Sequence, residues 1–226
     1  MKILKPKFSG LNRMVAAVVQ DAHTRDVIWA GNITEFEFRS VLRHGLVTVE
    51  AGSVSKMLDV RVDCDGDAVL MLVESSRARE WWSKRDPVFS QDPNNLVMVV
   101  VQDTKGDVRM VAYANAVAWQ RTLDTKHVTF WSRSRKELWT KGKESGNFLQ
   151  LQLYRVSMLG DVILCRVDVL GKGLACHTGT STCFFRSIFC AEPLLAPLVM
   201  TDKEQLEWVD ADVRPGFRPH PCNTAA

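Results

Sequence analysis

The sequence contains an internal repeat, which limits the folds open to it more than any other feature. Residues 15–21 read VAAVVQD and residues 97–103 read VMVVVQD, and each run is followed by an Asp-Val step and by an asparagine that precedes a helical stretch. Further on, the segment 62–67 (VDCDGD) aligns with the segment 156–161 (VSMLGD). Self-similarity of this kind predicts two related structural units in one polypeptide.

The two copies differ by one deletion. Val49 aligns with Phe130 at an offset of 81, whereas Val62 aligns with Val156 at an offset of 94. The first copy therefore lacks about 13 residues, which correspond to the part of the second copy that contains 138–147.

Both copies predict the same order of elements: a hairpin, a short helix, a further strand and a final pair of strands. Short apolar runs bounded by polar turns predict strands, and Thr34 and Gly45 suit the start and end of the first helix. The expected strands are 14–19, 27–30, 46–49, 57–62 and 68–73 in the first copy and 96–101, 108–113, 128–131, 149–156 and 162–167 in the second, with helices at 34–43 and 116–123.

We therefore predict an α+β fold of two tandem β-rich repeats with short helices, packed together as an intramolecular pseudo-dimer. The expected boundaries are 1–76 for the first repeat, 77–95 for a polar linker broken by two prolines, 96–191 for the second repeat and 192–226 for a proline-rich tail.

Composition is that of a globular protein with a real core. Hydrophobic residues make up 46% of the 226 positions and charged residues 24%, and the formal net charge is only +3. This balance gives no reason to expect a nucleic-acid partner, and no apolar run has the length of a signal peptide or a membrane span. We expect a cytoplasmic protein whose cysteines stay reduced and serve as metal ligands or buried thiols.

Three aspartates alternate at the end of a predicted strand and its turn. Asp63 and Asp65 fall on one face of the strand, and the turn at Gly66 can bring Asp67 toward them. Carboxylates gathered in this way repel one another unless a cation lies among them, and an all-oxygen site suits Mg²⁺. A solvated acidic turn is the alternative, and the spacing alone leaves both open.

Three cysteines predict a zinc site shared by the two copies. Cys176 and Cys183 lie seven residues apart, with His177 beside the first, and taken alone they favour two buried thiols. Cys64, between two of the aspartates, adds a third ligand, while its counterpart Met158 cannot. Three ligands with one open position for water are typical of a catalytic zinc ion.

A basic stretch in the second copy is suited to phosphate. Arginine forks and serine hydroxyls are good phosphate donors, and neighbouring tryptophans can stack on a base or pack in the core. An exposed basic surface is the simpler alternative, although the loop at 145–147 favours a phosphate clamp. The candidate substrate-binding residues are Trp131, Ser132, Arg133, Ser134, Arg135, Lys141, Ser145, Gly146 and Asn147.

On these motifs the chain resembles the phosphoribosyl-AMP cyclohydrolase family of histidine biosynthesis. The resemblance rests on the Gln-Asp hairpin, WSRSR at 131–135, LWTKG at 138–142, SGN at 145–147, DCDGD at 63–67 and ACHTG with Cys183 at 175–183, and it covers most of residues 11–186. It implies a hydrolase that opens the N1–C6 bond of the adenine ring of phosphoribosyl-AMP, with Zn²⁺ and Mg²⁺ as cofactors.

The resemblance also implies residue roles. Cys64, Cys176 and Cys183 would hold Zn²⁺, Asp63, Asp65 and Asp67 would hold Mg²⁺, and His177 would shuttle protons. Family members share metal ligands between the subunits of a homodimer, whereas here the motifs are split between two copies, so we expect one composite site per chain and a dead second site. Lys143 stands where the family usually has a glutamate, which leaves the role of that acidic group open.

Two alternatives stay open at this stage. A degenerate member of the family would bind a nucleotide without turnover. A structural zinc protein would need a fourth protein ligand, for which His177, Cys165 or Cys190 would have to serve. We expect a monomer that contains its own pseudo-dimer, while a further homodimer and a separate upstream pyrophosphohydrolase are left undecided.

Overall fold

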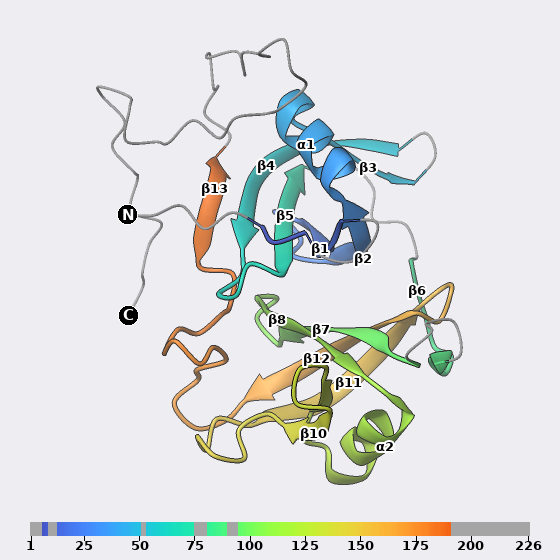
Figure 1. Cartoon of the computed structure of the whole chain (residues 1–226), viewed down its shortest axis with the longest axis vertical. Helices are drawn as coiled ribbons and strands as arrows, with labels where there is room; N and C mark the ends of the chain where they lie inside the picture. Colours follow the sequence, from blue (N-terminus) through green and yellow to red (C-terminus); the bar gives the residue numbers. More distant parts are fainter. Residues whose placement is uncertain (1–5, 9–12, 51–52, 75–80, 90–94, 191–226) are drawn as a thin grey trace.

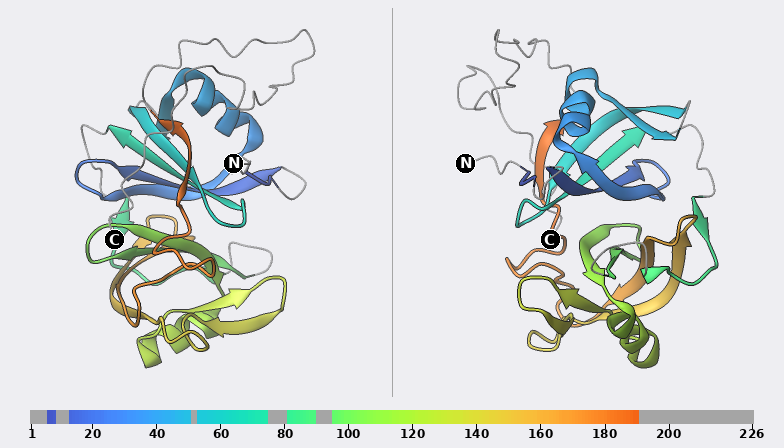
Figure 2. Two further views of the ribbon diagram at one scale, coloured as in Figure 1. Left: turned by 90° about the vertical axis from the view of Figure 1, so that its left-hand side faces the viewer. Right: turned by 45° about the vertical axis from the view of Figure 1, so that its right-hand side comes forward.

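The computed structural model of the chain describes residues 6–8, 13–50, 53–74, 81–89 and 95–190. These residues form two β-rich lobes, one above the other, each with one short helix (Figures 1 and 2). This mixture of many strands and two short helices agrees with the predicted α+β class. The predicted tail at 192–226 lies outside the described residues. Among the helices in the described ranges, none combines the length and hydrophobicity needed to cross a membrane.

The first lobe is a sheet with the strand order β13-β4-β5-β1-β2, in which β3 also pairs with β4. Its helix begins with a capping box, because the Thr34 side chain accepts from the Glu37 backbone while the Glu37 side chain binds back to Thr34, and it ends at Gly45 in the left-handed conformation. The elements are β1 (Met14–Asp21), β2 (Val27–Thr34), α1 (Glu35–His44), β3 (Leu46–Glu50), β4 (Ser53–Val62), β5 (Ala68–Glu74) and β13 (Arg186–Cys190).

The second lobe is a sheet with the order β6-β11-β12-β7-β8 and a separate two-stranded sheet of β10 and β9. Asn115 caps its helix by accepting from the Ala118 backbone. The elements are β6 (Trp82–Ser83), β7 (Val97–Asp103), β8 (Val108–Ala114), α2 (Ala116–Thr125), β9 (Thr129–Ser132), β10 (Glu137–Thr140), β11 (Leu149–Ser157) and β12 (Val162–Val169).

The two main sheets share one topology. In the first lobe β1 runs antiparallel to β2 and parallel to β5, and in the second lobe β7 runs antiparallel to β8 and parallel to β12. The register of each hairpin shifts at the same place, between Val19 and Gln20 in one and between Val101 and Gln102 in the other. The correspondence follows the sequence repeat residue by residue.

Three hydrophobic clusters explain why β1 and β7 read as unbroken apolar runs. Val15, Ala17 and Val19 face the core of the first lobe, whereas Ala16 and Val18 face a cluster that also contains residues of the second lobe. In β7, Val97, Val99 and Val101 likewise face the core of the second lobe, whereas Met98 and Val100 face the cluster that both lobes share. Strands buried on both faces lose the usual alternation with polar residues.

Each lobe also takes in a strand from beyond its own repeat. Strand β6 precedes β7 in the stretch predicted as a linker, and β13 follows the second repeat but pairs with β4 of the first lobe (Figure 1). The two additions are equivalent, because Arg186 pairs with Val62 and Ser83 pairs with the aligned Val156. The sequence pattern predicted neither of these strands, nor β10 in the basic stretch.

Candidate metal centre

The acidic turn joins β4 to β5 on the side of the first lobe that meets the second. Gly66 adopts the left-handed conformation (φ 81°) and closes the turn. Asp63 holds it from within, because its Oδ1 accepts from the backbone nitrogens of Gly66 (2.8 Å) and Ala68 (3.1 Å). With Asp63 fixed in this way, Cys64 and Asp65 lie at the outer part of the turn.

The thiol loop, residues 176–183, follows β12 and is held by its own threonines. The backbone nitrogen of Cys176 donates to the Thr180 carbonyl (3.0 Å), and the Thr178 hydroxyl donates to the Cys176 sulfur (3.0 Å). Thr180 in turn donates to the Thr182 carbonyl (2.7 Å). These bonds form a compact loop that keeps Cys176 and Cys183 buried and leaves His177 exposed.

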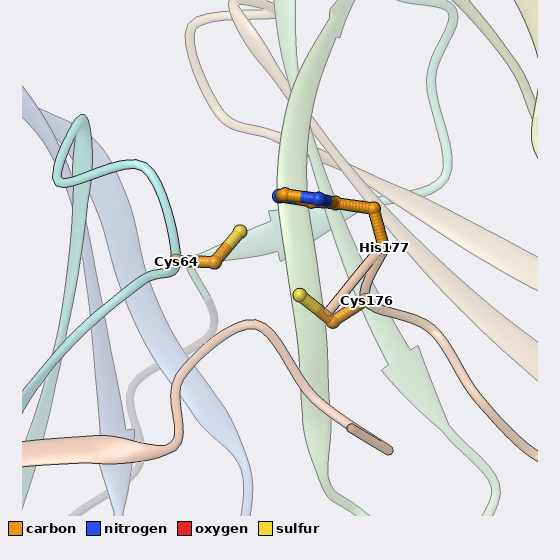
Figure 3. Close-up of side chains that lie close together, drawn as sticks. All are labelled: Cys64, Cys176 and His177. Carbon is orange, nitrogen blue, oxygen red and sulfur yellow. The ribbon is translucent and has the colours of Figure 1, made fainter. Parts of the chain in front are cut away.

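The acidic turn and the thiol loop meet between the lobes. The sulfurs of Cys64 and Cys176 and a ring nitrogen of His177 all lie within 4.8 Å of one another. Figure 3 shows Cys64 on the acidic turn and Cys176 on the thiol loop, with their sulfurs directed into the space between the two loops and the imidazole ring of His177 beside them. Cys64 is 112 positions from Cys176 in the sequence, so the cluster exists only because the lobes pack together.

Cys183 is the third thiol of the cluster. A hydrogen bond with Cys64, burial, and the negative charges of Cys64 and Cys176 raise the pKa of Cys183 far above its usual value. Burial also opposes ionisation of Cys176, yet hydrogen bonds from Thr178, Cys64 and Thr180 outweigh it and lower the pKa of Cys176. Thiols that compete in this way for one negative charge are the donor set that a soft cation stabilises.

A second group of ligands adjoins the thiols. One ligand atom each from Asp63, Cys64 and Asp65 lies within 4.8 Å of the others. Burial, and next the negative charge of Asp67, raise the pKa of Asp63 to about 6. The His177 Nε2 atom lies 3.5 Å from the Asp65 Oδ1 atom and so links the acidic turn to the thiol loop.

The basic stretch reaches the acidic turn through one arginine. The Arg133 guanidinium lies 3.4 Å from the Asp67 carboxylate across the lobe boundary and stacks over the Tyr113 ring at 4.2 Å. Arg135 instead pairs with Glu137 of its own hairpin at 3.3 Å. Ser132 accepts from the Arg135 backbone (3.3 Å).

The other candidate substrate residues divide between the surface and the interior. Ser134, Ser145 and Gly146 are exposed and Trp131 is half-buried. Lys141 is buried near the thiols, where burial lowers its pKa and the charges of Cys183 and Cys176 oppose that shift. Asn147 is buried as well, and its Oδ1 accepts from the backbone of Lys172 (2.8 Å), so it ties two loops together.

Several residues around the centre were not predicted from the sequence. The Tyr113 hydroxyl donates to the Asn32 side chain of the other lobe (3.4 Å), and the Arg186 guanidinium donates to the Cys64 carbonyl (3.1 Å). Arg109 binds the backbone of the thiol loop through the Ser181 carbonyl (2.8 Å). A charged residue in the otherwise apolar strand VRMVAYA was the one signal available for Arg109.

Comparison with known proteins identifies the class to which this chain belongs. Residues 110–185 match the family model described as phosphoribosyl-AMP cyclohydrolase. A phosphoribosyl-AMP cyclohydrolase of Ralstonia nicotianae is 44% identical over 110 residues, which are 48% of this chain and 75% of the relative. One of Desulfotalea psychrophila is 38% identical over 119 residues, 52% of this chain and 93% of the relative. A histidine biosynthesis bifunctional protein of Photobacterium profundum is 41% identical over 134 residues, 59% of this chain and 62% of the relative.

These relatives place the chain among hydrolases. More particularly, the chain belongs to the phosphoribosyl-AMP cyclohydrolase family. The segment that matches the family model contains the basic hairpin and the thiol loop but not the turn that carries Asp63, Cys64, Asp65 and Asp67.

Proposed function

We propose that this chain is a phosphoribosyl-AMP cyclohydrolase that hydrolyses the N1–C6 bond of the adenine ring at one composite centre between its lobes. The bond belongs to a cyclic amidine, and its opening gives an aminoimidazole carboxamide nucleotide. The observation that carries the proposal is the approach of Cys64, from the first lobe, to Cys176 and His177 of the second within 4.8 Å. Membership of the family supports the reaction, and the cluster of Cys64, Cys176 and His177 is the candidate site for it.

The residues present fit a zinc ion. Cys64 and Cys176 lie within 4.8 Å of His177, and Cys183 interacts with both thiols, so the cluster offers sulfur and nitrogen donors of the kind that zinc prefers in tetrahedral sites. Asp63, Asp65 and Asp67 offer the all-oxygen surroundings that Mg²⁺ prefers, beside the thiols and not among them. The donor chemistry thus supports adjacent sites for the two metals.

A zinc ion held there supplies Lewis acidity, which lowers the pKa of water from about 15.7 to about 7. The chain's own residues then manage protons and position the substrate. His177 is exposed and its Nε2 lies 3.5 Å from Asp65, so Asp65 orients the ring while the imidazole takes a proton from water and delivers it to the ring nitrogen of the leaving amidine. Arg133, with Ser132, Ser134 and Arg135 around it, binds phosphate oxygens.

The same chain would contain the pseudo-dimer that other members form from two subunits. In support, the lobes share one topology and exchange equivalent strands, β6 and β13. On this interpretation the units are 1–76 and 96–191, joined by 77–95, with β13 added to the first lobe's sheet. A monomer is then sufficient for a complete centre.

The turn aligned with the acidic turn is unsuited to metal. Met158 and Leu159 replace Cys64 and Asp65, and the segment 81–88 packs against this turn. The Arg85 guanidinium donates to the Met158 carbonyl (3.0 Å), and the Val88 backbone donates to the Gly160 carbonyl (2.8 Å). We therefore expect one zinc ion per chain.

The test combines turnover with metal content. Carboxamide formation is followed by ultraviolet absorbance, and zinc is measured in the purified parent, in Cys64→Ser and in the control Cys165→Ala, whose thiol is fully buried in β12. Because Cys64 supplies one of three ligands, its replacement should lower zinc affinity by more than roughly 100-fold, beyond the effect of outer partners, and abolish turnover. The control should keep both. Unchanged zinc content in Cys64→Ser would exclude the composite centre.

A second candidate, a structural zinc site, is favoured by one observation. The ring nitrogen of His177 lies close enough to the two sulfurs to act as a fourth ligand, and a closed four-ligand shell carries no water. His177→Ala separates the two functions. If the histidine moves protons, the variant keeps its zinc and loses turnover; if it closes the shell, zinc affinity falls as well.

A further inference from the structure

The thiol loop is attached to strand β8 at two consecutive residues. The backbone nitrogen of Cys183 donates to the Arg109 carbonyl (2.8 Å), and the Thr182 hydroxyl donates to the Val108 carbonyl (2.8 Å). Strand β8 therefore determines where the sulfur of Cys183 lies. The geometry of the metal centre therefore depends on how β8 lies relative to the thiol loop.

Arg109 strengthens this attachment with its side chain. Its Nη1 atom donates to the Ser181 carbonyl (2.8 Å), while its Nε (2.9 Å) and Nη2 atoms donate to Asp103 Oδ2. The side chains of Arg109 and Asp103 are only 12% and 5% exposed. A planar guanidinium with both ends engaged in a buried site is held rigidly, which a flexible ammonium group would not reproduce.

Asp103 is itself fixed by the hairpin that precedes β8. Its Oδ1 accepts from the backbone nitrogens of Lys105 (3.0 Å) and Asp107 (2.8 Å). A continuous chain of hydrogen bonds thus runs from the turn between β7 and β8 through Asp103 and Arg109 to the carbonyl of Ser181, two residues before Cys183. No part of it is a proposed metal ligand.

The first lobe provides an internal comparison. Asp21 ends β1 as Asp103 ends β7, and it likewise accepts from its hairpin backbone, at His23 (2.7 Å) and Thr24 (2.8 Å). The position aligned with Arg109 is Ile28, which is 6% exposed in the core of the first lobe. The carboxylate is thus sufficient to hold a hairpin, and the arginine is present in the copy to which the thiol loop attaches.

We propose that Arg109 is a positioning residue for the zinc centre, which holds the thiol loop on β8 so that Cys183 reaches the thiols of Cys64 and Cys176. The inference rests on the proposed zinc site but not on turnover. On this inference, part of the zinc affinity of the chain depends on Arg109, which lies outside the family motifs quoted above.

Zinc affinity of the metal-stripped full chain tests the proposal, measured by competition with a chromogenic chelator. Arg109→Met should raise the zinc dissociation constant by about 10- to 100-fold, the range for groups that orient ligands. Arg109→Lys keeps a charge beside Asp103 but loses the fork, so it should fall between parent and Arg109→Met. The matched control is Arg61→Met, which removes an Arg-Asp pair (Arg61 Nε to Asp59 Oδ2, 2.8 Å) in the first lobe. Its zinc affinity should stay within about threefold of the parent.

Two further readouts separate positioning from general destabilisation. In Arg109→Lys, turnover at saturating zinc should return to the parent value, while half-maximal activity should need about 10-fold more zinc. A parental zinc dissociation constant in both Arg109 variants, or a loss equal to that of Arg61→Met, would overturn the proposal. Failure of turnover in the parent with zinc still bound would contradict the proposed function and leave the affinity comparison decisive for Arg109.

Discussion

Asp63 both closes its turn and carries a charge, whereas the aligned residue of the second lobe only closes the turn. In the first lobe its carboxylate accepts the two backbone bonds that close the turn, and it carries a charge that burial and Asp67 make unfavourable. In the second lobe Ser157 takes the aligned position, and its hydroxyl accepts from the backbone of Asp161 (3.2 Å) and Val162 (3.1 Å). A neutral hydroxyl is therefore sufficient for the turn, and the charge of Asp63 is consistent with the Mg²⁺ site proposed above.

The pH dependence of stability reports that charge. The pKa of Asp63 is raised from 3.8 to about 6, so between these values the folded protein binds more protons than the unfolded chain. The stability associated with this group is therefore complete below about pH 4 and is lost as the pH rises through about 6, by up to about 3 kcal/mol. We expect the thermal midpoint of the metal-free chain to fall over this range.

Asp63→Asn is the control for this titration, because its side-chain oxygen can still accept from Gly66 and Ala68. The variant should lack the part of the fall that belongs to Asp63, and Mg²⁺ should raise the midpoint of the parent more at pH 7 than at pH 5. Parallel profiles for the two proteins would contradict the assignment.

At the scale of elements, the hairpin of β9 and β10 and its following loop bring Arg133 and Lys141 to the centre. Gly142 allows the loop to turn directly after Lys141. It adopts φ 95°, and a Cβ atom there would lie 2.5 Å from the backbone of Asn147. Gly146 in the same loop also has a positive φ (72°) but has open space around it.

This pair of glycines gives a matched prediction. Gly146→Ala should cost about 1 kcal/mol for the left-handed conformation alone, whereas Gly142→Ala adds a backbone clash and should cost about 3 kcal/mol. Urea unfolding measures both values. Turnover should also fall more in Gly142→Ala, since Lys141 is displaced. Equal losses of stability would show that the loop adapts and that the close approach to Asn147 is unimportant.

At the scale of the whole molecule, the two lobes are joined by reciprocal hydrogen bonds at their equivalent hairpins. The Gln20 carboxamide donates to the carbonyls of Arg25 and Gly106 (both 2.7 Å), and the Gln102 carboxamide donates to the same two carbonyls (2.6 and 3.0 Å). Arg25 also forms an ion pair with Asp107. The glutamine of each Gln-Asp motif therefore joins the two hairpins across the lobes.

The shared carbonyls predict a coupling between the two glutamines. Gln20→Ala or Gln102→Ala leaves each carbonyl with one carboxamide donor, and each should cost about 1 kcal/mol, while the double variant leaves both carbonyls without one and should lose about 1 kcal/mol more than the sum. Unfolding in urea measures the cycle. Gln152→Ala, which removes one exposed bond to Asp168, should change stability by less than about 0.5 kcal/mol. Strict additivity of the two glutamines would exclude the coupling.

Local chemistry explains which elements were predictable. Thr34 with Glu37 and the left-handed Gly45 delimit α1 as their residue types predict, and the strands of both repeats follow the apolar runs. Strand β6 has two residues and β13 pairs with a strand more than 100 positions earlier, so neither leaves a local pattern. The approach of Cys64 to Cys176 followed from complementary motifs in two copies, whereas the bond from Arg109 to Ser181 had no such signal.

Local sequence patterns were enough to predict both helices, most of the strands and the kinds of ligand available, because periodicity, caps and side-chain chemistry act over a few residues. Three features could be recognised only in the folded chain: the apolar cluster that both sheets bury, the pairing of β6 with β11 and of β13 with β4, and the hydrogen bond from Arg109 to the thiol loop. These features depend on contacts between distant residues, whose geometry is settled by the packing of the whole chain.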